Sequence, residues 1–209
     1  MSFGAAFRKE FERLLRLRRD VRRFRPDPVD PALLQRVVDH ARLAPSVGLS
    51  EPWRFISVDT SEARAAVIDT FERCNAEALA AYSDDRRARY ARLKLEGLRE
   101  APVQLAIFAD TGTDKGAGLG RRTMPEMAHY SVVMAIQTIW LAARAEGLGL
   151  GWVSILDPDI VSQAVGAPAE WDLVAYLCIG WPLEEQETPD LERAGWECRS
   201  SSVTIRSLS

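Results

Sequence analysis

The stretch from residue 127 to 145 is the most apolar part of this chain, and it narrows the folds that the chain can adopt. Its centre, VVMAIQTIWLAA, is apolar on nearly every side, as expected of a helix that other elements cover all round. A span facing lipid would rarely carry the polar side chains found in this stretch, which are His129, Tyr130, Ser131, Gln137, Thr138 and Arg144. We therefore expect a buried helix at the core of a soluble domain, and no membrane partner.

Apolar runs typical of strands alternate with helical patterns along the rest of the chain. The expected strands are WRFISVD at 53–59, VQLAIFAD at 103–110, GLGLGWVSIL at 147–156 and LVAYLCIGWP at 173–182. The other expected helices are 4 to about 20, 31–43, 61–82, 85–100 and 157–166. A length of 209 residues suits one domain, and no repeat or linker divides the chain. We expect a single domain over residues 1–209 that mixes helices and strands.

Charge and cysteine content exclude several classes of protein. The net charge is −3, so a basic site must be local and a nucleic-acid partner is not expected. Three widely spaced cysteines form neither a disulfide framework nor a zinc-binding pair, and two histidines are too few for a histidine-rich metal site. The charged start of the chain lacks the apolar block of a signal peptide, and free thiols favour the reducing cytoplasm.

The segment RRDVRRFRPD belongs to a cluster of six arginines within residues 16–25. Guanidinium groups stay charged and donate paired hydrogen bonds, which suits them to phosphate and to planar anionic rings. A reduced flavin carries negative charge on its pyrimidine side, and nearby cations would stabilise it. A run of arginines is more often a solvated basic helix end than a ligand site. A surface that binds nucleic acid is the third interpretation. The arginines alone leave all three open.

Two further segments have the composition of ligand-contacting loops. PSVGLSEPWRF at 45–55 can place hydroxyls and backbone amides on a ligand, or it can simply connect a helix to a strand. In GLGLGWVSILDP at 147–158, glycines allow close approach to a ring, and Ser154 needs a hydrogen-bond partner if it is buried in the strand. Neither this string nor GAGLGRR at 116–122 fits a dinucleotide-binding or P-loop motif.

In this order, RRxxRF, PSxxxxxPW and a late GLGxxW resemble the motifs of the flavin-dependent nitroreductase superfamily. The closer resemblance is to the branch that converts reduced FMN to 5,6-dimethylbenzimidazole. It is carried by RRDVRRFRPDPVD, APSVGLSEPWRF, GLGRRTMPEMAHYSVVMAIQTIWLAARAEGLGLGWVSILDP and LCIGWP. The resemblance implies an α+β, nitroreductase-like three-layer fold with a mixed central sheet flanked by helices. It also implies an intertwined homodimer with two sites at the dimer interface.

The resemblance implies a reaction as well. Reduced FMN would be the substrate rather than a recycled cofactor, and O2 would be the co-substrate. The products would be 5,6-dimethylbenzimidazole, the lower ligand of cobalamin, and erythrose 4-phosphate. A separate NAD(P)H-dependent flavin reductase would supply the reduced FMN. The alternatives are a conventional FMN-dependent NAD(P)H nitroreductase or flavin reductase, and a non-catalytic flavin-binding module.

By position in the matching motifs, the resemblance implies two sets of site residues. In the loop at 45–52, Leu49 and Glu51 stand where many nitroreductases have Asn and Gln. The implied catalytic residues are Asp20 and Ser154. The implied cofactor-binding residues are Arg18, Arg19, Arg22, Ser46, Ser50, Leu98 and Arg199.

Asp20 favours an enzyme that consumes reduced flavin as its substrate over one that recycles flavin as a cofactor, because nitroreductases commonly have a small polar residue at this position. Breaking down the ring system requires protons to leave, and a general base must lie within hydrogen-bond reach of them. Our hypothesis is that Asp20 is this base and that Ser154 orients the oxygen adduct or its proton network. The structural alternative is that Asp20 caps the helix or pairs with Arg23. We also expect the charged segment 75–95 to be a lid, with a solvated helical hairpin as its alternative.

Overall fold

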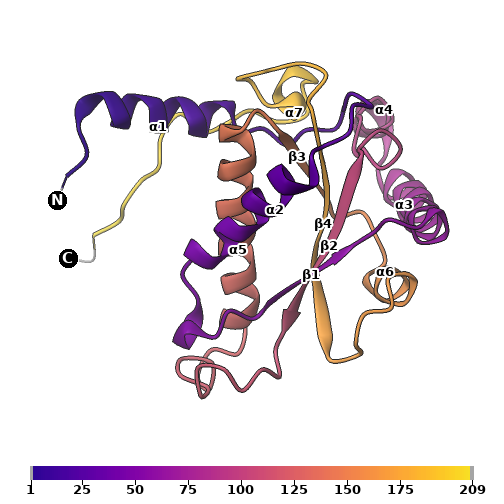
Figure 1. The fold of residues 1–209 in the computed structure, drawn as a ribbon. Helices are drawn as coiled ribbons and strands as arrows, with labels where there is room; N and C mark the ends of the chain where they lie inside the picture. Colours follow the sequence, from indigo (N-terminus) through magenta and orange to yellow (C-terminus); the bar gives the residue numbers. More distant parts are fainter. Residues whose placement is uncertain (1, 208–209) are drawn as a thin grey trace.

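The computed structural model describes residues 2–207, which form one four-stranded sheet with helices on both faces (Figure 1). The strand order is β1-β2-β4-β3, so the two longest strands lie in the middle. Three strands fall within the runs expected from the sequence, and β4 begins two residues before its expected run of 173–182. Their bounds are Trp53–Ser57 for β1, Val103–Asp110 for β2, Gly149–Val153 for β3 and Trp171–Gly180 for β4.

The three strand pairs of the sheet are all antiparallel, whereas the sequence analysis expects a mixed sheet. Ser57, at the end of β1, pairs with Leu105 near the start of β2. The helical excursion between these strands therefore returns the chain to the point where it left the sheet, and β2 runs back along β1. The parallel pairing that the structure does contain is an isolated bridge between Asp20 and Leu150 on β3.

Side chains of β2 alternate between two cores, one on each face of the sheet. Leu105 and Ile107 belong to the first core, which joins the sheet to α5 (Met127–Ala145) and α2 (Pro31–Asp39). Ala106 and Phe108 belong to the second, which joins it to α3 (Ser61–Ala81) and α6 (Pro158–Ala164). The three-layer α+β arrangement is thus confirmed. The helices are α1 Ala5–Leu17, α2 Pro31–Asp39, α3 Ser61–Ala81, α4 Asp84–Tyr90, α5 Met127–Ala145, α6 Pro158–Ala164 and α7 Asp190–Arg193, with 3-10 turns η1 His40–Leu43 and η2 Val47–Leu49.

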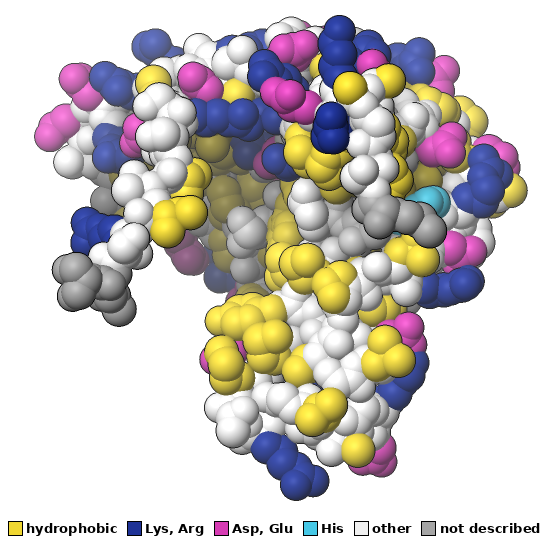
Figure 2. Space-filling view, turned by 90° about the vertical axis from the view of Figure 1, so that its left-hand side faces the viewer, with side chains coloured by type: hydrophobic (Ala, Val, Ile, Leu, Met, Phe, Trp, Pro, Cys, Tyr) yellow, Lys and Arg dark blue, Asp and Glu magenta, His cyan; other side chains and the backbone are white. Residues whose placement is uncertain are grey.

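The central helix α5 has the expected bounds, and most of its surface is buried against the sheet and α2. One stripe is left uncovered within a single chain, formed by Tyr130, Val133 and Met134. Helix α1 extends away from the body and also exposes large apolar side chains. The face on the α1 side is hollowed, and hydrophobic side chains gather in the hollow (Figure 2). None of the helices in residues 2–207 has the length and apolarity to cross a bilayer.

The helix expected over 85–100 is wrong beyond Tyr90, where α4 ends. Leu98 is buried in the second core, and the missing side chain of Gly97 leaves room for the ring of Phe24. The carbonyl of Lys94 accepts a hydrogen bond from Arg22 Nη1 at 3.1 Å. These contacts with a distant segment draw residues 91–100 off a helical path, although their charged composition favours a helix.

The glycines of β3 allow the arginine segment to lie directly against this edge strand. The backbone N–H of Val21 donates to the carbonyl of Leu150 at 3.0 Å. A Cβ atom on Gly151 would lie 2.1 Å from the carbonyl oxygen of Val21, and one on Gly149 would meet the Val21 side chain. The glycines thus serve a close approach of backbone to backbone, which holds Asp20 beside the sheet.

We expect Gly151→Ala to lower the free energy of unfolding by about 1–3 kcal/mol, because the added methyl group meets backbone that cannot rotate away. Urea denaturation monitored by circular dichroism measures the change. Gly4→Ala is the matched control, since nothing lies within 4 Å of its Cβ position. A Gly151→Ala protein as stable as the unsubstituted chain would contradict this account of β3.

Candidate functional site

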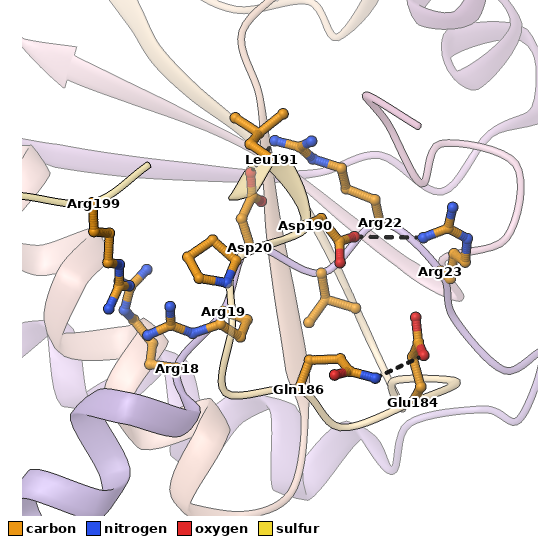
Figure 3. A pocket seen from close by; sticks show the side chains of 12 residues that line it. Arg18, Arg19, Asp20, Arg22, Arg23, Glu184, Gln186, Asp190, Leu191 and Arg199 are labelled. Carbon is orange, nitrogen blue, oxygen red and sulfur yellow. Dashed lines mark hydrogen bonds and ion pairs between the residues drawn. The ribbon is translucent and has the colours of Figure 1, made fainter. Parts of the chain in front are cut away.

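A cavity of about 190 Å³ lies where the segment 18–23 meets the segment 184–199. Arginine side chains of the first segment surround it, together with Asp20 (Figure 3). Of the sequence-predicted residues, the fold brings five together here, which are Arg18, Arg19, Asp20, Arg22 and Arg199. The other lining residues are Val21, Arg23, Glu184, Gln186, Pro189, Asp190 and Leu191.

Three of these cations, Arg18, Arg19 and Arg199, form what we call the arginine group, and they converge at one end of the cavity (Figure 3). Burial and the nearby charge of Arg199 lower the pKa of Arg18, against the opposing effect of Asp20. Burial and the charges of Arg199 and Arg18 lower the pKa of Arg19. Within residues 2–207, no carboxylate forms an ion pair with any member of the group. Crowded cations of this kind favour a bound anion.

Helix α5 holds two members of the arginine group, Arg18 and Arg19, in place. The guanidinium of Arg18 lies over the ring of Trp140, 4.9 Å from its centroid. The indole N–H of Trp140 donates to the carbonyl of Arg19 at 3.2 Å. Arg19 Nη2 donates to Leu15 O at 3.1 Å, while its buried Nε has no hydrogen-bond partner within the described residues. An unsatisfied buried donor is costly, and an acceptor from a bound anion would satisfy it.

Asp20 is fixed by a hydrogen bond to each of its carboxylate oxygens. Oδ1 accepts from the backbone N–H of Trp152 at 3.0 Å, and Oδ2 accepts from Arg22 Nη2 at 2.8 Å. The alternative partner, Arg23, instead pairs with Asp190 at 3.4 Å. The Asp20 side chain is 33% exposed, so a ligand in the cavity can reach it. An oriented, partly exposed carboxylate within hydrogen-bond reach of a ligand can act as a proton acceptor.

Arg22 occupies a different position from the arginine group. Its side chain is only 13% exposed, and it bridges Asp20 and the carbonyl of Lys94. In Figure 3 it lies at the far side of Asp20 from Arg18 and Arg199. Arg22 therefore orients Asp20 and links it to the segment 75–95, and its predicted contact with a flavin stays a prediction.

The remaining sequence-predicted residues lie outside this cavity. Ser154 is the first residue after β3 rather than inside the strand, and it is exposed. Leu98 is 2% exposed and packed in the second core. Ser46 Oγ accepts from the N–H of Glu51 at 3.1 Å, and Ser50 is buried with no hydrogen-bond partner for Oγ in the described part of the chain. Their roles toward a ligand stay predictions.

The loop 45–52, here called the serine loop, lies at the opposite end of α5 from the arginine group. The N–H of Val47 donates to Ser131 Oγ, near the start of α5, at 3.0 Å. The arginine group contacts Trp140, nine residues further along, which is about 14 Å along the helix axis. Within one chain, the fold therefore does not bring the two predicted flavin-contacting segments together.

The sequence analysis missed the segment 184–191, which forms one wall of the cavity. Its residues are polar and irregularly spaced, so no periodicity or motif marks them. It also missed the backbone amide of Trp152 as a partner of Asp20. The glycine pattern before Trp152 was a usable signal, because it indicates that another segment approaches this strand closely.

The family model for the nitroreductase family matches residues 15–181, and this chain belongs to that family. The chain is 57% identical over 204 residues to the 5,6-dimethylbenzimidazole synthase of Rhodospirillum rubrum, covering 98% of this chain and 97% of that protein. It is 49% identical over 197 residues to the 5,6-dimethylbenzimidazole synthase of Rhodobacter capsulatus, covering 94% and 95%.

A solved structure of oxidized iodotyrosine deiodinase bound to FMN and 3-iodo-L-tyrosine has a similar fold. The TM-score is 0.75 at 22% identity, over 95% of this chain and 98% of that one. At this identity the likeness concerns the fold, and the two bound molecules belong to that protein.

Proposed function

We propose that this chain is a 5,6-dimethylbenzimidazole synthase that consumes reduced FMN and O2 and releases erythrose 4-phosphate. The observation that carries the proposal is the carboxylate of Asp20, held at the edge of a cationic cavity by Trp152 and Arg22. The relatives of that name, which match nearly the full length at 57% and 49% identity, support the formation of 5,6-dimethylbenzimidazole. A conventional FMN-dependent nitroreductase is the second candidate, favoured by the family as a whole.

The arginine group fits the anionic parts of FMN. Three guanidinium groups without carboxylate partners in residues 2–207 match a phosphate dianion or the charged pyrimidine edge of a reduced flavin. The unpartnered Nε of Arg19 adds a buried donor that needs an acceptor. The donor set therefore fits the proposed substrate, although a cavity of about 190 Å³ is smaller than sites that enclose a whole ligand of this size.

Each residue then has a distinct role. Bound reduced FMN would supply the electrons for O2 and the ring atoms of the product. Arg18, Arg19 and Arg199 hold its negative charge, and Asp20 accepts a proton from the ring system. Ser154 would hold a proton network at the reactive edge of the flavin. The segment 75–95 is proposed to act as a lid that limits access of water. Leu98 is 2% exposed in the second core, so its proposed contact with the flavin requires residues 91–100 to shift.

A second copy of the chain would complete the site, in agreement with the homodimer that the resemblance implies. The family is commonly dimeric. The serine loop does not meet the arginine group of its own chain, and we propose that the partner's loop supplies the contacts of Ser46 and Ser50. The uncovered stripe on α5 and the apolar hollow beside α1 supply a surface for such an interface (Figure 2).

We expect Met134→Glu, on the exposed stripe of α5, to yield a monomer, because a carboxylate would be buried at the interface without a partner. FMN affinity should fall at least about tenfold with the arginine group intact, since the partner's hydrogen bonds are lost. Analytical ultracentrifugation and equilibrium dialysis measure the two effects. Ile160→Glu on α6, which is also exposed but lies on the other face of the sheet, is the control. A monomer that binds FMN as tightly as the unsubstituted protein would refute the shared site.

The fate of reduced FMN in air tests the proposed reaction. A flavin reductase with NAD(P)H supplies the reduced FMN, and the products are separated by chromatography. Formation of 5,6-dimethylbenzimidazole that requires both this protein and O2 supports the proposal. Oxidation of NAD(P)H by the purified chain with intact FMN would favour the conventional nitroreductase, and tight FMN binding without reaction would favour a flavin-binding module.

Two broader expectations also stay proposals. The chain is proposed to be a single domain over residues 1–209, of which residues 1, 208 and 209 lie outside the described part. Its location is proposed to be the cytoplasm, in keeping with three free thiols, Cys74, Cys178 and Cys198.

A further inference from the structure

An aromatic cluster joins the segment 75–95, here called the lid, to the C-terminal segment that carries Arg199. The ring of Trp196 meets the ring of Tyr82 edge-on, with centroids 5.5 Å apart, and that of Tyr90 at 6.0 Å. The guanidinium of Arg86 lies over the Trp196 ring, 4.9 Å from its centroid. Trp196 thus contacts lid residues on both sides of the turn between α3 and α4.

The lid side of this cluster is itself anchored. Tyr90 is 7% exposed, and its hydroxyl donates to Asn75 Oδ1 at 2.8 Å. Tyr82 and Tyr90 contact each other, with centroids 5.1 Å apart. Arg89 Nη1 donates to the carbonyl of Gly195 at 3.4 Å, next to Trp196. The contacts of Trp196 therefore hold the C-terminal segment against an ordered part of the lid.

Arg199 follows Trp196 by only three residues. An extended chain spans at most about 11 Å over that distance, so the position of Trp196 limits where Arg199 can reach. Arg199 lines the cavity beside Arg18 and Arg19 (Figure 3). A second link runs from the cavity to the same lid, through the hydrogen bond between Arg22 Nη1 and Lys94 O.

We infer that Trp196 is a positioning residue that couples the lid to the arginine group, so that an anion bound by Arg199 strengthens the docking of the lid. The nature of the anion, the phosphate of FMN, rests on the proposed function. If Trp196 only packed against the lid, the lid would stay docked whatever is bound at Arg199. If Trp196 couples the lid to Arg199, the solvent exposure of the lid backbone depends on the bound ligand.

Hydrogen–deuterium exchange of the lid separates these cases. The comparison uses the full chain, Trp196→Ala and Trp196→Phe, each alone, with oxidised FMN and with inorganic phosphate. Without ligand, Trp196→Ala should raise lid exchange about tenfold, because two edge-to-face contacts and one cation–π contact are lost. Trp196→Phe should recover most of the protection, since it keeps an aromatic ring at this position.

With FMN, lid exchange should slow in the unsubstituted protein and not in Trp196→Ala, although Arg18 and Arg19 still bind the ligand. In Arg199→Ala, the ligand-free lid should exchange as in the unsubstituted protein, but the slowing caused by FMN should be lost. Equal lid exchange in Trp196→Ala and the unsubstituted protein would overturn the inference. So would slowing by FMN that survives in Arg199→Ala. A lid that responds to phosphate but not to FMN would support the coupling and refute the proposed substrate.

Discussion

Asp20→Asn should lower the rate of 5,6-dimethylbenzimidazole formation by about 10²- to 10⁴-fold, the usual contribution of a positioned general base. The amide has nearly the same shape as the carboxylate, and its oxygen can still accept the Trp152 N–H that Oδ1 accepts at 3.0 Å. It cannot take up a proton at neutral pH. Binding of FMN should therefore change little, because the arginine group is untouched. The product is measured by chromatography under single-turnover conditions, and FMN affinity by equilibrium dialysis.

The substitution has one structural side effect that needs a control. The amide nitrogen of an asparagine would face Arg22 Nη2, so the 2.8 Å ion pair is lost together with the base. Arg22→Lys alters the same ion pair and leaves the Asp20 carboxylate in place. We expect Arg22→Lys to keep much more activity than Asp20→Asn. Equal losses in the two proteins would assign the effect to the ion pair, and full activity of Asp20→Asn would refute the catalytic role.

The double substitution Arg18→Ala/Arg19→Ala should weaken FMN binding by about 100-fold or more, since each charge-assisted hydrogen bond contributes about 1.5–3 kcal/mol. Riboflavin, which lacks the phosphate, should lose less affinity, so the preference for FMN over riboflavin should shrink. Calorimetric titration of both ligands measures this preference. The stability of the unliganded chain should not fall greatly, because the substitution removes two cations whose pKa is lowered by burial and by the nearby charge of Arg199.

Arg25→Ala is the matched control for the double substitution. Arg25 comes from the same arginine-rich segment, but it lies over the ring of Trp181, 5.7 Å from the centroid, and pairs with Asp27. It does not line the cavity. Its removal lowers the net positive charge of the segment and should leave FMN affinity unchanged. An FMN affinity that responds equally to Arg25→Ala would indicate a diffuse electrostatic effect and no specific anion site.

The large elements of the fold follow from local patterns in the sequence. The apolar run of β2 and the nearly all-round apolar run of α5 predict a buried strand and a buried helix, and both have the expected bounds. The start of α2 also depends on neighbouring residues, because Asp30 precedes Pro31 and its side chain accepts from the N–H of Ala32. These signals are readable because burial and capping act on residues close together in the chain.

The failures of prediction occur where distant segments compete with local preference. Residues 91–100 have the charged composition of a helix, but contacts with Phe24 and Arg22 remove them from one. The antiparallel pairing of the strands could not be predicted from the sequence either. It depends on where the helical segment between β1 and β2 returns the chain to the sheet.

The sequence by itself determined the family, the approximate positions of the strands and of most helices, and the presence of an arginine cluster with one acid inside it. Long contiguous motifs and hydrophobic periodicity involve residues close together in the chain, so they can be recognised before the fold is known. Only the tertiary structure decided which arginines line one cavity and that Arg22 orients Asp20 by a hydrogen bond. It also decided that the serine loop lies at the other end of α5 from the arginine group. It also placed Trp196 between the lid and Arg199. Most of these contacts join residues far apart in the chain, and even the pairing of Arg22 with Asp20, two residues apart, depends on the hydrogen bonds that Trp152 and Lys94 make to them.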